Sequence, residues 1–188
     1  MKIQDITVEY QHNPIGLDTA APRFAWKLAD DSQNIYQKAY HIQVSKDDEF
    51  RELAWDSRKV DSDESIQIVY NGETLTSFTE YFWRVKVWDQ EETETDWSDI
   101  GRFEMAMMSW KDWEADWITP EYDYKAPKTA CPILRKEFQI GKRVTKARIY
   151  VTAKGLYELR LNGKKVGRDF LTPGWTSYNK RTLYQVYD

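Results

Sequence analysis

The side chains best suited to ligand chemistry lie in one loop of the sequence, residues 171–181. This loop carries Trp175, Tyr178 and Arg181. Flat aromatic faces stack on the C–H groups of a sugar ring, and guanidinium forks hydrogen-bond to its hydroxyls. The amide of Asn162, in a turn just upstream, offers a further hydrogen-bonding group of this kind. The pattern predicts a carbohydrate contact made by Asn162, Trp175, Tyr178 and Arg181.

A second interpretation of the same loop is structural. Pro173-Gly174 is a turn signal, and Trp175 directly after it could pack the loop onto the body of the protein. Large aromatic side chains are usually buried, so packing is the interpretation that we favour for Trp175. The exposure of this indole in the folded chain distinguishes the two.

Residues for catalysis are harder to find. Hydrolysis of a glycosidic bond needs two carboxyl groups across one cleft, and the spacing of the 31 acidic residues marks no such pair. His41 alternates on an expected strand, which makes it a packing or edge residue. Cys131 precedes a proline and has no neighbouring histidine to activate its thiol. We therefore predict no catalytic residue in this chain, and no hydrolytic activity of the chain alone.

The sequence supports no cofactor either. It carries neither a glycine-rich phosphate loop nor a pair of histidines at metal-binding spacing. Its most acidic segment, residues 89–96, contains Glu91, Glu92 and Glu94 without the glycine and asparagine pattern of a calcium loop. We interpret this segment as a solvated loop rather than as a cation or partner site, so calcium binding has no support in the sequence.

The elements that must position these residues are β-strands. Apolar and polar side chains alternate with a period of two at residues 23–28, 39–44 and 81–87, which is typical of strands with one buried face. Weaker strands are expected at residues 3–9, 53–56, 65–69 and 101–105. About seven short strands in about a hundred residues favour a β-sandwich.

Four residues are assigned to the framework of this sandwich. Trp26 and Trp83 lie on the apolar faces of alternating strands, so we expect both in the core. Tyr81 opens the strand with the clearest alternation and follows Leu75 in the preceding corner. This arrangement is typical of a tyrosine corner, in which the phenol hydrogen-bonds to backbone upstream. The predicted role of Tyr81 is therefore architectural.

The second part of the chain repeats the strand pattern. Alternation at residues 147–153 and 157–161 predicts two strands. Asn162-Gly163 follows the second of them and predicts a tight type I′ hairpin turn, because both residue types tolerate positive φ. Further strands are expected at residues 133–138 and 182–187.

Length and composition narrow the functional classes. The 188 residues suffice for two modules, which we place at 1–108 and 109–188. A net charge of −4 makes nucleic acid an unsuitable partner, since the chain cannot neutralise a phosphate backbone. Apolar runs are too short to span a membrane. The first residues do not read as a secretion signal, so a cytoplasmic location is expected.

Several motifs occur in a fixed order along the chain. They are Asn13-Pro14-Ile15-Gly16-Leu17-Asp18, Pro22-Arg23-Phe24-Ala25-Trp26, Tyr81-Phe82-Trp83-Arg84-Val85, Leu161-Asn162-Gly163 and Pro173-Gly174-Trp175-Thr176-Ser177-Tyr178. In this order they resemble the amino-terminal region of bacterial α-L-rhamnosidases (glycoside hydrolase family 78). The resemblance covers essentially the whole chain.

This resemblance implies an all-β chain: a fibronectin-type-III-like sandwich followed by the truncated start of a jelly-roll-like, carbohydrate-binding-type sandwich. In the family, two acidic residues of a later (α/α)₆ barrel hydrolyse terminal α-L-rhamnosides with inversion. The chain would supply scaffolding and substrate recognition to that barrel. Gly167-Arg168-Asp169 departs from the family pattern, in which glycine and aspartate are often adjacent. Some relatives bind rhamnose through calcium in such a module, but those ligands cannot be matched here.

A truncated second sandwich would expose apolar strands and unpaired edges. We expect residues 147–153 or 184–186 to be covered by another copy of the chain, or the segment to pack differently from a full jelly roll. Three alternatives stay open: a stand-alone sugar-binding module, a pair of protein-interaction domains, and modules that only brace the barrel. A receptor would need a secretion signal and often disulfides, for which the sequence gives no sign.

Overall fold

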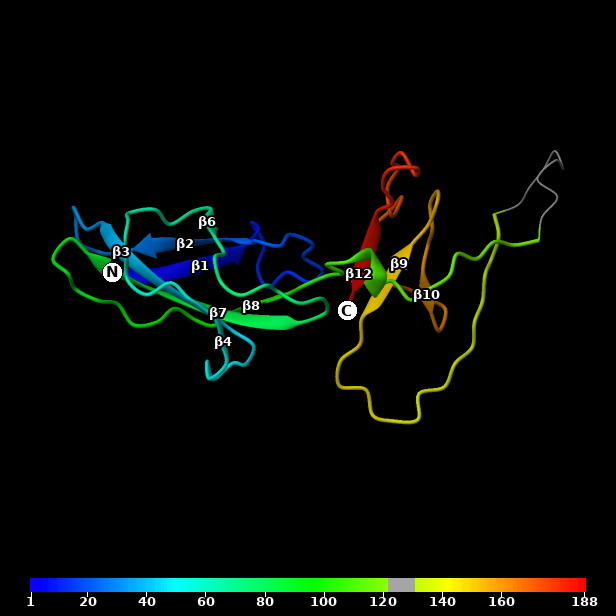
Figure 1. Ribbon diagram of the computed structural model, residues 1–188, viewed down its shortest axis with the longest axis horizontal. Helices are drawn as coiled ribbons and strands as arrows, with labels where there is room; N and C mark the ends of the chain where they lie inside the picture. Colours follow the sequence, from blue (N-terminus) through cyan, green and yellow to red (C-terminus); the bar gives the residue numbers. More distant parts are fainter. Residues whose placement is uncertain (122–130) are drawn as a thin grey trace.

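The two modules form separate groups of strands that lie end to end (Figure 1). The structure is a computed structural model that describes residues 1–121 and 131–188. Strands β1 to β8 belong to the first module, and β9 to β12 belong to the second. The all-β fold class is confirmed. Within the described residues, no helix is long and apolar enough to cross a membrane.

The first module is a sandwich of two antiparallel sheets, as expected. The smaller sheet has the order β1-β2-β6, and the larger has the order β4-β3-β7-β8 with β5 on β3. The strands of the smaller sheet are β1 (Lys2–Val8), β2 (Arg23–Ala29) and β6 (Ile68–Val69). Those of the larger are β3 (Gln37–Ser45), β4 (Leu53–Asp56), β5 (Val60–Asp61), β7 (Glu80–Asp89) and β8 (Gly101–Glu104).

Aromatic side chains from both sheets fill the core. Trp26 and Trp83 are each 1% exposed, and the ring of Phe24 lies 4.7 Å from that of Trp83. The indole N–H of Trp26 donates to the side-chain oxygen of Gln37 at 3.0 Å, which satisfies the buried polar atom. A Cβ at Gly101 would lie 2.3 Å from Nε1 of Trp83. Glycine at 101 therefore makes room for the largest core side chain.

Tyr81 fixes the corner that leads into β7. Its hydroxyl accepts a hydrogen bond from the Thr76 backbone N–H at 3.1 Å, and its ring stacks on Phe103 at 5.4 Å. Tyr81 is 1% exposed and Leu75 is 3% exposed. The phenol thus bonds to backbone upstream of its own strand, in the manner of a tyrosine corner.

The second module has two separate two-stranded sheets among its described residues. One pairs β9 (Ile149–Thr152) with β12 (Tyr184–Tyr187), and the other pairs β10 (Arg160–Leu161) with β11 (Lys164–Lys165). The expected hairpin at Asn162-Gly163 is confirmed, with φ of 50° and 80° at these two residues. A single 3₁₀ turn, η1 (Trp110–Asp112), begins the connection between the modules.

Two expectations for the second module are wrong. Residues 133–138 form no strand and run outside the sheets in Figure 1. No strand edge lies beside them to pair with, and the side chain of Ile133 is 95% exposed. The expectation that Trp175 packs onto the body of the protein also fails. Trp110 is 84%, Trp117 57% and Trp175 81% exposed. A two-stranded sheet has no opposing layer that could cover them.

Replacing Tyr81 by phenylalanine tests the corner. The change removes the buried Tyr81 hydroxyl and leaves the Thr76 N–H without its acceptor, so we expect the free energy of unfolding to fall by about 1 kcal/mol in urea titration. Tyr36→Phe is the control, because Tyr36 is 60% exposed and should lose almost nothing. Equal stability of the two variants would contradict the assigned role of Tyr81.

Candidate functional site

The loop predicted to contact sugar leaves its tryptophan open. Trp175 is 81% exposed, and its ring lies 5.9 Å from that of Tyr178 at an angle of 44°. The Tyr178 hydroxyl accepts a hydrogen bond from the Gly155 N–H at 2.7 Å, which ties the loop to the end of β9. The interpretation that we favoured for Trp175, a plug packed onto the protein, is therefore wrong. Tyr178 anchors the loop instead.

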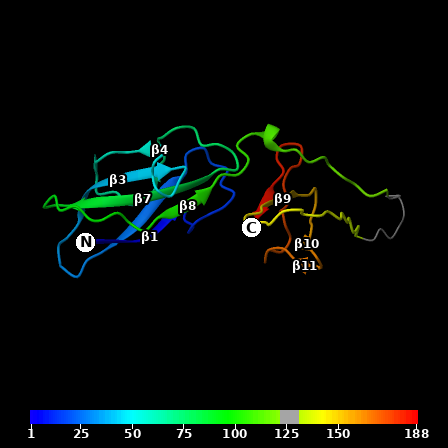
Figure 2. The same cartoon turned by 90° about the horizontal axis from the view of Figure 1, so that it is seen from below.

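The structure brings only part of the predicted set together. The side chain of Arg181 is exposed, and its backbone carbonyl accepts from the Thr176 hydroxyl at 2.6 Å within the same loop. Asn162 is exposed in the turn of the β10–β11 hairpin. Figures 1 and 2 both place this hairpin at the opposite end of the module from the red loop that contains Trp175. Asn162 thus lies apart from the other three residues.

A groove of about 430 Å³ lies where the two modules meet. Its volume falls in the range of small-molecule sites, roughly 300–1,000 Å³. The lining residues come from both modules and the connection between them: Met107, Met108, Ser109, Trp110, Trp113, Trp117, Thr152, Thr182 and Tyr184. Three indoles and a phenol make this surface suitable for stacking on a sugar ring or for covering by polypeptide.

Polar groups at the groove are arranged around Tyr184. The Tyr184 hydroxyl accepts a hydrogen bond from the Met107 N–H at 3.1 Å, so its own proton stays available for donation. The ring of Trp113 lies 6.1 Å from that of Tyr184. The ammonium group of Lys154 lies 5.0 Å from the Trp117 ring centroid. Sequence reasoning missed this groove, because its lining residues come from segments that are distant in the sequence.

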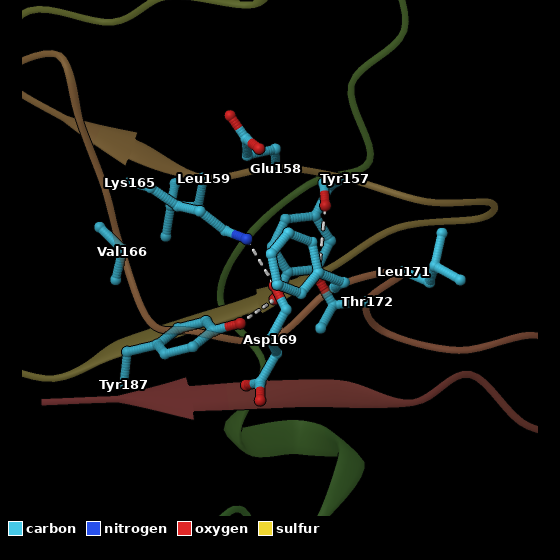
Figure 3. A pocket seen from close by; sticks show the side chains of 10 residues that line it. Tyr157, Glu158, Leu159, Lys165, Val166, Asp169, Leu171, Thr172 and Tyr187 are labelled. Atoms are coloured by element: carbon cyan, nitrogen blue, oxygen red, sulfur yellow. Dashed lines mark hydrogen bonds between the residues drawn. The ribbon is translucent and has the colours of Figure 1, made fainter.

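A second, smaller cavity of about 50 Å³ lies in the second module (Figure 3). The Tyr157 hydroxyl lies 3.1 Å from the Tyr187 hydroxyl, and burial raises the pKa of Tyr157. Glu158 and Asp169 both line the cavity, but Figure 3 shows their carboxylates pointing away from each other. This space is too small for a sugar ring, and its two acids do not face one bond.

Lysine side chains pair with two carboxylates of the acidic loop that follows β7. Glu92 accepts hydrogen bonds from Lys38 and Lys59, and these bonds lower the pKa of Glu92 to about 2. Glu94 pairs with Lys86. Within the described part of the chain, no cluster of histidine, cysteine and acidic residues could hold a metal ion. Glu92 and Glu94 are thus paired with lysines at the protein surface.

Two family profiles divide the chain in the same way as the strands. Residues 3–109 match the Rha78A-like N-terminal immunoglobulin domain, and residues 142–188 match the α-L-rhamnosidase N-terminal domain. The chain belongs to the α-L-rhamnosidase family. The resemblance read from the motifs is thereby confirmed.

Similar α-L-rhamnosidases are much longer than this chain. One from Alteromonas sp. (strain LOR) is 37% identical over 94% of the chain, and one from Formosa agariphila is 33% identical over 97%. The chain spans only about a fifth of these relatives, 20% and 22% of their lengths. The sequence therefore corresponds to a small part of a typical α-L-rhamnosidase.

Solved α-L-rhamnosidase structures share the fold. The one from Dictyoglumus thermophilum matches 100% of the chain and 23% of its own, with a TM-score of 0.89 and 37% identity. The Streptomyces avermitilis α-L-rhamnosidase complexed with L-rhamnose matches 100% of the chain and 20% of its own, with a TM-score of 0.63 and 28% identity. Both matches include the two modules.

Proposed function

We propose that this chain forms the amino-terminal, non-catalytic modules, at 1–108 and 109–188, of an enzyme that hydrolyses terminal α-L-rhamnosides. The observation that carries the proposal is the pair of profile matches, both to amino-terminal domains of this family. The chemistry is assigned to an (α/α)₆ barrel downstream, which is also the main partner of these modules. A cytoplasmic location belongs to the same proposal and is supported by the exposed thiol of Cys131, since free thiols persist in reducing compartments.

The placement of the carboxyl groups supports a non-catalytic role. An inverting glycosidase holds two carboxyls roughly 6.5–9.5 Å apart across its substrate. In the described residues the two acids that share a cavity, Glu158 and Asp169, point apart around a space of about 50 Å³. Scaffolding and substrate recognition are the roles that we propose for this region.

Release of nitrophenol from 4-nitrophenyl α-L-rhamnoside tests the assignment of chemistry. We expect no turnover by the purified chain and clear turnover by the longer protein that includes the barrel. The longer protein lacking residues 1–188 is the matched control. Loss of soluble enzyme in this control would indicate that the two modules brace the barrel. Turnover by the 188-residue chain itself would refute the proposal.

Substrate recognition is proposed for the loop that contains Trp175, Tyr178 and Arg181. Its support is an exposed indole beside an anchored phenol, because an aromatic face held in place can stack on a sugar at little entropic cost. Asn162 would act separately, from the β10–β11 turn. The ligand is the rhamnose ring of the substrate, and no calcium ion is invoked.

Tryptophan fluorescence during titration with L-rhamnose tests this contact. We expect a saturable change at millimolar sugar that Trp175→Ala abolishes, because the substitution removes the stacking face. Trp110→Ala is the matched control, since Trp110 is equally exposed but lies at the groove. If the unchanged chain shows no response, these modules only brace the barrel.

Self-association is the remaining proposal. Large apolar side chains of the connection and second module are exposed, among them Ile133, Phe138 and Phe170. In the described part of the chain, β9 and β12 pair only with each other, so each has a free edge. We expect sedimentation velocity to show a dimer whose fraction increases with protein concentration. A strict monomer that binds little of a hydrophobic dye would count against a second copy as the cover.

A further inference from the structure

Glu104, the last residue of β8, is a buried carboxylate that faces the module junction. It is 2% exposed. Its Oε1 accepts from Arg148 Nε at 2.9 Å, and its Oε2 accepts from Arg148 Nη2 at 3.1 Å. Lys146 Nζ lies 2.6 Å from the same Oε2. In the described residues, every cation that pairs with this first-module carboxylate belongs to the second module.

Arg148 is held from several sides. Its Nη1 donates to the Ala147 carbonyl at 2.9 Å and also bonds to the carboxylate of Asp188. Burial alone would lower the pKa of Arg148, but the hydrogen bonds and charge of Glu104 more than offset this, and the pKa is raised. A guanidinium fork on a carboxylate constrains the relative orientation of its partners as well as their distance.

The other junction contacts constrain orientation less. The ring of Phe78 meets that of Tyr150 edge-on at 5.1 Å. Gly16 lies so close to Val186 that a Cβ would be 2.8 Å from its side chain. These are contacts between apolar surfaces, which resist separation but allow small rotations. The single hydrogen bond between Met107 and Tyr184 also allows the modules to rotate about the axis of that bond.

We propose that the Glu104–Arg148 pair locks the second module in one orientation on the first. Among the described residues Glu104 has no cation of its own module, so its buried charge is paired only when Arg148 and Lys146 of the second module lie against it. The fork of Arg148 therefore selects one angle within the docked state. It sets where the groove and the Trp175 loop stand relative to the first module. This inference holds whether or not these modules bind sugar.

The distance distribution between spin labels on the two modules tests the lock. Labels are placed at Val69 on β6 and Lys164 on β11, which are both exposed, in a Cys131→Ser background. The unchanged chain should give one narrow distribution. Arg148→Met should broaden it, and Arg148→Lys should broaden it less, because lysine keeps the charge but loses the fork.

The control is Glu80→Gln. The Glu80 carboxylate also lies 3.4 Å from Lys146 Nζ, but it is more exposed than that of Glu104. The distance distribution of the Glu80→Gln variant should therefore match that of the unchanged chain. An Arg148→Met distribution as narrow as that of the unchanged chain would overturn the proposal. Arg148 lies outside the first core, so the result does not depend on whether Glu104 variants fold.

A neutral double variant, Glu104→Gln with Arg148→Met, separates orientation from stability. Arg148→Met alone leaves the buried charge of Glu104 with Lys146 as its remaining cation, whereas the double variant removes that charge, so the thermal midpoint should recover relative to Arg148→Met alone. The distance distribution should nevertheless stay broad, because the fork is gone. A narrow distribution in the double variant would assign the orientation to the apolar contacts and refute the lock.

Discussion

The structure depends on one constraint: a β-sheet buries one face only if a second layer covers it. The first module meets this constraint, because two sheets enclose Trp26, Trp83 and Phe24. The second module does not meet it within the described residues, and several of its aromatic side chains, such as Trp175 and Phe170, lie at the surface. The same chemistry, large aromatic residues on short strands, therefore gives a core in one module and exposed aromatic surface in the other.

Period-two alternation predicted the first module well because each strand has a partner on both sides or a facing sheet. The strand that was expected at residues 133–138 is not formed, since a strand exists only through a neighbour. Local turn chemistry was more reliable. Asn162-Gly163 forms its hairpin from the φ preferences of two residues and needs no distant partner.

The candidate site was predicted in part for the same reason. Trp175 and Tyr178 are close in sequence, so their proximity follows from one loop. The groove joins Met107 to Tyr184, and the buried pair joins Glu104 to Arg148, across a boundary where no local pattern operates. The exposure of Trp175 was predicted wrongly because average burial of tryptophan assumes that a covering layer is present.

The junction changes how the two modules should be understood. An interface between domains of one chain usually permits movement unless it is large and apolar. Here a buried carboxylate takes its cations from across the boundary, so directional bonds add to limited apolar contact. The first module has its own core and is joined to the second through this pair. It can therefore fix the orientation of the second module without contributing a catalytic group. In the proposed lock, the orientation of the modules depends on charges at the end of β8 and just before β9, rather than on the size of the interface.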